Sequence, residues 1–118
     1  MTVETERYIG LCMAAGGIRS GTDTVLSEVR AGHSKLVLVA CDASDRTKKQ
    51  ISDKCSYYKV KLFSTELTAD EIASMIGKHS ACVAVSFTGR GPWANVLKAL
   101  ESEKTDVPDT TEDRKDDN

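Results

Sequence analysis

The stretch Lys35–Cys41, KLVLVAC, decides the fold. After its first lysine the run is entirely apolar and contains two β-branched valines. An apolar run of this length without alternation is typical of a strand that is covered on both faces. A second stretch, Ala81–Phe87 (ACVAVSF), has the same character. The two stretches therefore predict the buried centre of a sheet that has helices on both sides.

Helical patterns alternate with strand patterns outward from this centre. In residues 4–15 the apolar residues Tyr8, Leu11, Cys12 and Ala15 recur at spacings of three and four, which indicates one buried helix face. Glycine or proline marks the ends of most such segments. The predicted helices cover residues 4–15, 21–32, 45–57, 68–77 and 92–100, and two further short strands are predicted at 18–20 and 59–63.

Three of the predicted helices begin with a recognisable signal. Ser44 or Asp45 can cap the helix that follows the central strand. Thr68 precedes Glu71 by three residues, which is the spacing of a capping box. Pro92 suits the first position of the last helix, because the missing N–H of proline has no partner there in any case.

The order of elements predicts an α/β fold, a three-layer α-β-α sandwich around a central four-stranded mixed sheet. Residues 1–100 form this domain and carry 13 basic and 10 acidic side chains, a net charge of +3. Residues 101–118 carry 3 basic and 8 acidic side chains, a net charge of −5, and offer only Val107 to a core. Such a segment buries too little apolar surface to fold, so a disordered acidic tail is expected.

Composition and motifs argue against several classes of function. The four cysteines form no CxxC pair, which predicts reduced and mostly buried thiols and no metal site. The sequence holds no GxSxG, HExxH or P-loop motif, and His33 and His79 lie in polar turns, so neither catalysis nor a cofactor is expected. No apolar run reaches the roughly 20 residues of a membrane span, and no signal-peptide pattern opens the chain. A cytoplasmic protein is expected.

The sequence has more features that suit nucleic-acid binding than features that suit catalysis. Residues 20–24, SGTDT, open the second helix with free N–H groups and hydroxyls that can bond phosphate oxygens, although an ordinary glycine-led cap has the same sequence. Basic residues gather in the middle of the chain, where they form either a phosphate-binding surface or a solvated helix face. They are Lys35, Arg46, Lys48, Lys49, Lys54, Lys59 and Lys61.

One more glycine-rich segment lies ahead of a helix. Residues 88–91, TGRG, separate the last predicted strand from the last helix. Two glycines before a helix start can hold a phosphate, and they can equally form a plain turn. The sequence leaves both readings open.

Four blocks of the chain resemble the family of kink-turn RNA-binding ribosomal proteins, the L7Ae/L30e group, and most closely its small bacterial, YlxQ-like branch. The blocks are GLCMAAGGIRSG at 10–21, VRAGHSKLVLVACDASDRTKK at 29–49, DKCSYY at 53–58 and IGKHSACVAV at 76–85. The second block is the most specific of the four. The resemblance covers about residues 5–100, almost all of the predicted domain.

The resemblance implies three RNA-binding segments. They are the glycine turn with the start of the second helix, the loop after the central strand, and the loop before the last strand, which packs against an extruded base. The corresponding residues are Gly21, Thr22, Asp23, Thr24 and Ser27, then Asp42, Ala43 and Ser44, then Lys78, His79, Ser80 and Ala81. Lys35, Lys48 and Lys49 are expected to add electrostatic support.

The expected function is that of a non-enzymatic, ribosome-associated protein that recognises kink-turn-like RNA, with ribosomal RNA as a candidate partner. The protein is expected to be a monomer and to bind neither DNA nor a membrane. Strong kink-turn binders of the family carry Asn or Lys, then Glu or Gln, then Lys, where this chain has Asp23, Thr24 and Ser27. A carboxylate cannot donate a hydrogen bond to guanine and repels phosphate. The alternative is therefore a protein-interaction module on the same fold with weakened RNA binding.

Overall fold

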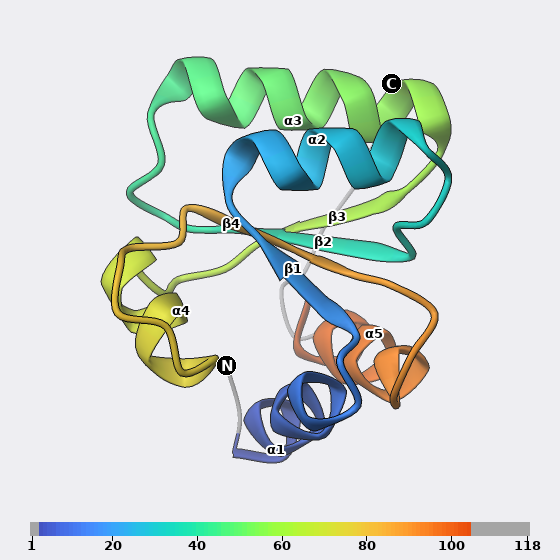
Figure 1. Cartoon of the computed structure of the whole chain (residues 1–118), viewed down its shortest axis with the longest axis vertical. Coiled ribbons are helices and arrows are strands. Elements are labelled where there is room, and N and C mark those ends of the chain that lie inside the picture. The colour runs from blue at the N-terminus through green and yellow to red at the C-terminus, as the bar shows by residue number, and fades with distance from the viewer. Residues whose placement is uncertain (1–2, 105–118) are drawn as a thin grey trace.

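One four-stranded sheet lies at the centre of the computed structural model, which describes residues 3–104 (Figure 1). The strands are β1 (Ile18–Ser20), β2 (Leu36–Val39), β3 (Lys61–Ser64) and β4 (Ala84–Phe87). They follow the spatial order β1-β4-β2-β3. β4 is antiparallel to β1 and β2, and β2 is parallel to β3. The sheet is therefore mixed, as predicted, and β1, β2 and β3 all run in the same direction.

Five helices cover the two faces of this sheet. They are α1 (Val3–Ala14), α2 (Thr22–Arg30), α3 (Asp45–Tyr58), α4 (Ala69–Met75) and α5 (Trp93–Lys104). In Figure 1, α2 and α3 lie on one side of the sheet and α1, α4 and α5 on the other. The predicted three-layer α-β-α sandwich is confirmed. α5 continues to Lys104, past the predicted domain boundary at 100, and residues 105–118 of the predicted tail lie outside the described residues.

Each face of the sheet has its own core. Alternate residues of the two central strands point to opposite faces, so Val37 and Val39 pack beneath α2 and α3 while Leu36 and Leu38 pack over α1, α4 and α5. All four are at most 2% exposed. This burial on both faces is what the unbroken apolar run of β2 predicts.

Two helix caps agree with the sequence signals. The Ser44 Oγ accepts from the Thr47 N–H at 3.1 Å, so Ser44 rather than Asp45 caps α3. The Thr68 Oγ1 accepts from the Glu71 N–H at 3.2 Å, and the Glu71 Oε1 accepts from the Thr68 N–H at 2.9 Å. The predicted capping box of α4 is confirmed.

β4 begins at Ala84 rather than at the predicted Ala81, and two further elements also begin later than predicted. The third strand was expected from Lys59, but α3 extends to Tyr58 and Lys59 is its left-handed C-cap, with φ 59°. A residue in this conformation cannot begin a strand, and β3 starts at Lys61 instead. Pro92 is not the first residue of α5. Its carbonyl accepts from Asn95 and Val96, and the helix begins at Trp93.

The structure separates the four cysteines into buried and exposed thiols. Cys12, Cys55 and Cys82 are buried and Cys41 is exposed, which agrees with the expectation of mostly buried thiols. Burial raises the pKa of Cys12 and of Cys55 to about 11. Because the thiolate is the reactive form, a shift from 9 to 11 leaves about 100-fold less of it near neutral pH.

We expect a thiol-specific reagent at pH 8 to modify one cysteine rapidly in the native chain, namely Cys41. The other three should react only after denaturant unfolds the protein, since they lie in the core. The measurement is the time course of reagent absorbance with and without denaturant. Cys41→Ser should remove the fast phase, and a fast phase that persists in this variant would contradict the buried assignment.

Candidate nucleic-acid interface

Four connecting segments meet at one end of the sheet. Because β1, β2 and β3 are parallel, their carboxyl ends share this end with the start of the antiparallel β4. The segments are the β1–α2 junction at Gly21, the β2–α3 loop at 40–44, the β3–α4 loop at 65–68 and the α4–β4 loop at 76–83. We call this region the loop end. It lies on the left of Figure 1, beside the starts of α2 and α3.

Backbone hydrogen bonds fix the segments of the loop end to one another. The Gly21 N–H donates to the Ala84 carbonyl at 3.0 Å, and the Ala40 N–H donates to the Val83 carbonyl at 2.7 Å. The Cys41 N–H donates to the Leu67 carbonyl at 2.9 Å. These bonds connect all four segments to the sheet or to each other, so the surface is held in place before any ligand arrives.

Gly21 gives the start of α2 its shape. It is the N-cap residue, with φ 101° and ψ 143°, a backbone conformation that residues other than glycine rarely adopt. Among residues 3–104, no side-chain hydrogen bond caps α2. The N–H groups of the first turn are therefore open to an external acceptor, and an anion is favoured there by the helix dipole.

Two of the predicted RNA-binding segments are displayed side by side at the loop end. On α2, Asp23, Thr24 and Ser27 are exposed and Thr22 is half-buried. In the α4–β4 loop, residues 78–81 (Lys, His, Ser and Ala) are all exposed. The Gly21–Ala84 hydrogen bond places the start of α2 directly next to the end of this loop. The arrangement offers amides, hydroxyls and a lysine to a polyanion.

The third predicted segment contributes to the fold more than to the surface. Ala43 is 6% exposed and belongs to the core beneath α2 and α3, so its side chain is not available to RNA. The Asp42 Oδ1 accepts from the Ala69 N–H at 2.8 Å and so holds the start of α4 against the β2–α3 loop. Ser44 caps α3. Sequence similarity alone does not distinguish these structural roles from contact with a ligand.

The three predicted supporting lysines do not act together. The Lys48 Nζ donates to the Cys41 carbonyl at 2.9 Å, so this half-buried lysine lies at the loop end. Lys49 is exposed and pairs with Asp53 at 3.3 Å along α3. Lys35 precedes β2, and its N–H donates to the Phe87 carbonyl at the opposite end of the sheet. Lys35 therefore lies away from the loop end, at the opposite end of the sheet from Lys48.

The β3–α4 loop was missed as a part of the interface. Its Leu67 carbonyl receives the Cys41 N–H, and its Thr65 N–H donates to the Val39 carbonyl at 3.0 Å. The signal that could have found it is the strand direction, because every loop that follows a parallel strand emerges at the same end of the sheet. Within residues 3–104, no group of three or more His, Cys, Asp or Glu side chains could hold a metal ion, and no helix is long and apolar enough to cross a bilayer.

Comparison with known families and proteins supports the resemblance seen in the sequence. Residues 4–97 match the ribosomal protein L7Ae/L30e/S12e/Gadd45 family. The chain is 42% identical over 92 residues to the RNA-binding protein YlxQ of Bacillus subtilis (strain 168), covering 78% of this chain and 89% of that protein. It is 46% identical over 70 residues to the RNA-binding protein YlxQ of Enterococcus faecium, covering 59% of this chain and 67% of that protein.

More distant similarities agree with these matches. The chain is 28% identical over 85 residues to the large ribosomal subunit protein eL30 of Archaeoglobus fulgidus, covering 72% of this chain and 94% of that protein. A solved structure of a Bacillus halodurans C protein of unknown function superposes with a TM-score of 0.73 at 25% identity, over 86% of this chain and 96% of that one. The Giardia lamblia 15.5kD RNA binding protein superposes with a TM-score of 0.71 at 16% identity, over 89% of this chain and 88% of that one, and shows the shared fold.

Proposed function

Because this chain belongs to the ribosomal protein L7Ae/L30e/S12e/Gadd45 family, we propose that it is a non-enzymatic protein that binds structured RNA of the kink-turn type through its loop end. The observation that carries the proposal is the uncapped first turn of α2 beside the exposed loop at 78–81. The YlxQ relatives are named as RNA-binding proteins, which supports RNA as the partner. The eL30 relative supports a ribosomal RNA target.

The proposed contacts follow from the chemistry of the two exposed segments. The free N–H groups of the first turn of α2 and the hydroxyls of Thr22 and Thr24 bond phosphate oxygens on one side of a sharp bend. Lys78 neutralises a phosphate on the other side. Ala81, exposed and small, packs against a base that the bend pushes out of its stack. The protein acts in this proposal as a cytoplasmic monomer.

A second function is favoured by one specific residue. Asp23 is exposed in the first turn of α2. Its carboxylate stabilises the positive end of the helix, and it opposes any phosphate that approaches the same N–H groups. The same fold with this residue would suit a protein-interaction module in which RNA binding has weakened.

Titration with a kink-turn RNA separates the two functions. We expect the full chain to bind this RNA more tightly than an unkinked duplex of the same composition, and to lose affinity steeply as salt rises. Lys78→Glu should weaken binding roughly tenfold by placing a negative charge next to phosphate, whereas Lys54→Glu, the same change on the exposed surface of α3, should have little effect. Absence of binding at low salt would support the interaction module instead.

A further inference from the structure

A second basic surface lies at the end of the sheet opposite the loop end. A shallow cavity of about 340 Å³ opens there between β1, the end of α2 and the loop after β4. Its charged lining consists of Arg19, Lys35 and Arg90, together with Glu28 and the histidine His33. We call it the basic basin. It contains Lys35, which sequence reasoning assigned to the other interface, and part of the TGRG segment at 88–91.

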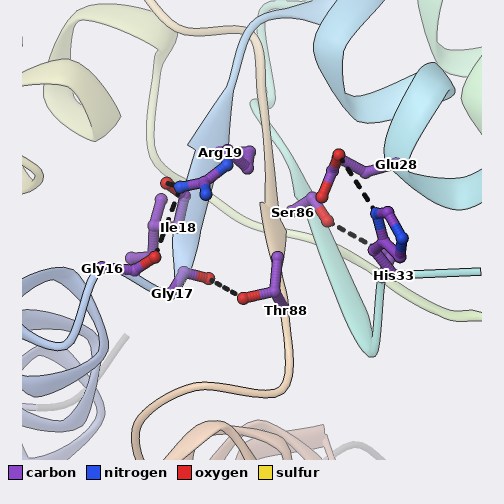
Figure 2. Close-up of polar contacts among 9 residues, drawn as sticks. Gly16, Gly17, Ile18, Arg19, Glu28, His33, Ser86 and Thr88 are labelled. Carbon is purple, nitrogen blue, oxygen red and sulfur yellow. Dashed lines mark hydrogen bonds and ion pairs between the residues drawn. The ribbon is translucent and has the colours of Figure 1, made fainter.

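The loop that forms the floor of the basic basin is fixed rather than free. The Thr88 N–H and the Thr88 Oγ1 both donate to the Gly17 carbonyl, at 2.8 and 3.2 Å, as Figure 2 shows for the hydroxyl. A Cβ on Gly17 would overlap the carbonyl of Arg90, and a Cβ on Gly91 would lie 2.8 Å from the Cα of Cys12 on α1. The loop thus packs closely against Gly17 beside the sheet at one end and against Cys12 of α1 at the other. Arg90 is exposed between these two contacts.

The cations around this floor are positioned from separate elements. The Arg19 Nη1 donates to the Gly16 and Ile18 carbonyls at 3.3 Å, which holds the guanidinium at the open edge of β1. Lys35 lies on the other side of β4, where its Cε would be 3.7 Å from a Cβ built on Gly89. Arg19, Lys35 and Arg90 are all exposed. The three positive charges therefore line the same open cavity from three separate segments of the chain.

The acidic residue of the basic basin does not cancel this charge. Glu28 is 20% exposed, and its carboxylate lies 3.6 Å from the Nδ1 of His33. Figure 2 places this pair on one side of β4 and Arg19 on the other. Without counting His33, three positive side chains and one negative side chain leave the basin with a net positive charge. A shallow, open surface of this kind fits a polyanion better than a small enclosed ligand.

The distance between the two surfaces points to one shared partner. Gly21 at the loop end is bonded to Ala84, and Lys35 in the basin is bonded to Phe87, so the anchor points lie three residue steps apart along β4. At about 3.3 Å per residue, this is roughly 10 Å. The two surfaces are therefore close enough for one folded RNA to contact both.

We propose that the basic basin is a second phosphate-contact surface, which grips the backbone of the same structured RNA through Arg19, Lys35 and Arg90. This inference rests on the proposed function. Contacts to the backbone carry no sequence information, so the basin adds affinity and orientation and leaves the choice of RNA to the loop end.

The test removes two cations of the basin and compares the result with the removal of two cations elsewhere. Lys35→Ala combined with Arg90→Ala is measured against Arg7→Ala combined with Lys54→Ala, which removes the same charge from exposed positions on α1 and α3. The probe is a kink-turn RNA with long stems, titrated with the full chain at several salt concentrations. Thermal unfolding of each variant confirms that it remains folded.

The basin variant should bind roughly tenfold more weakly at moderate salt. Its affinity should also depend less steeply on salt, because the magnitude of the slope of log affinity against log salt decreases by about two, one for each lost phosphate contact. The control variant should keep nearly the natural slope. Equal affinity and slope in the two variants would overturn the basin while leaving the loop end intact. Failure of the natural chain to bind the RNA at all would overturn the proposed function itself.

Discussion

The chain that carries Asp23→Asn together with Ser27→Lys should bind kink-turn RNA roughly 10- to 100-fold more tightly than the natural chain. Asp23 lies in the first turn of α2, and Ser27 is exposed one turn further along the same helix. The amide of asparagine can donate to guanine where the carboxylate only accepts, and the lysine adds a cation within reach of phosphate. The measurement is RNA affinity at two salt concentrations.

A gain of affinity is informative because an unfolded variant cannot produce it. The matched control is Asp53→Asn together with Ser52→Lys, which makes the same change of charge on the exposed surface of α3. Within the described part of the chain, Asp53 forms one exposed ion pair, with Lys49, so its loss should cost little stability. If the control raised RNA affinity as much as the α2 variant, net charge and not the start of α2 would be responsible, and the interface would be misplaced.

Gly91→Ala should destabilise the fold by about 2–5 kcal/mol, because the new methyl group adds both backbone strain and an overlap with α1. Gly91 has φ +78°, which is unfavourable for alanine, and the new Cβ would lie 2.8 Å from the Cα of Cys12. Relief of the overlap requires α1 to move away from the loop after β4. The measurement is the free energy of unfolding from urea denaturation, followed by fluorescence of Trp93.

Gly10→Ala provides the control for this prediction. Gly10 lies inside α1, and a Cβ built on it meets nothing within 4 Å. Alanine should stabilise the helix there by about 0.5–1 kcal/mol, since glycine has the greater conformational entropy in the unfolded chain. Equal stability of the Gly91→Ala and Gly10→Ala variants would show that the contact between Gly91 and α1 is not part of the native fold.

Much of the fold could be predicted because local signals and burial agree. The unbroken apolar run of β2 lies at the centre of the sheet, and the caps at Ser44 and Thr68 begin α3 and α4 as the sequence indicates. The start of β3 was not predictable in the same way. Lysine is not a residue type that favours a left-handed conformation. Lys59 adopts one because the chain turns there from α3 into the sheet.

The candidate interface was predictable in outline but not residue by residue. The loop at 78–81 and the start of α2 were expected, and their proximity follows from the directions of the strands. The burial of Ala43 depends on packing beneath α2 and α3, which similarity of sequence does not reveal. Lys35 seemed to belong with Lys48 and Lys49 because the three are close in sequence, yet a strand carries the chain from one end of the sheet to the other between them.

The hydroxyl pair of Ser34 and Ser86 has a consequence for the register of β4 in the sheet. The two oxygens lie 2.6 Å apart in the interior, on the side of the sheet that faces α2 and α3. If β4 slipped by one residue, Ser86 would turn to the opposite, apolar face and lose this partner, at a cost of about 1–3 kcal/mol. The serine pair thus favours the observed register of β4. In this register the Ala84 and Phe87 carbonyls accept the backbone hydrogen bonds that fix the loop end and the basic basin at the two ends of the strand.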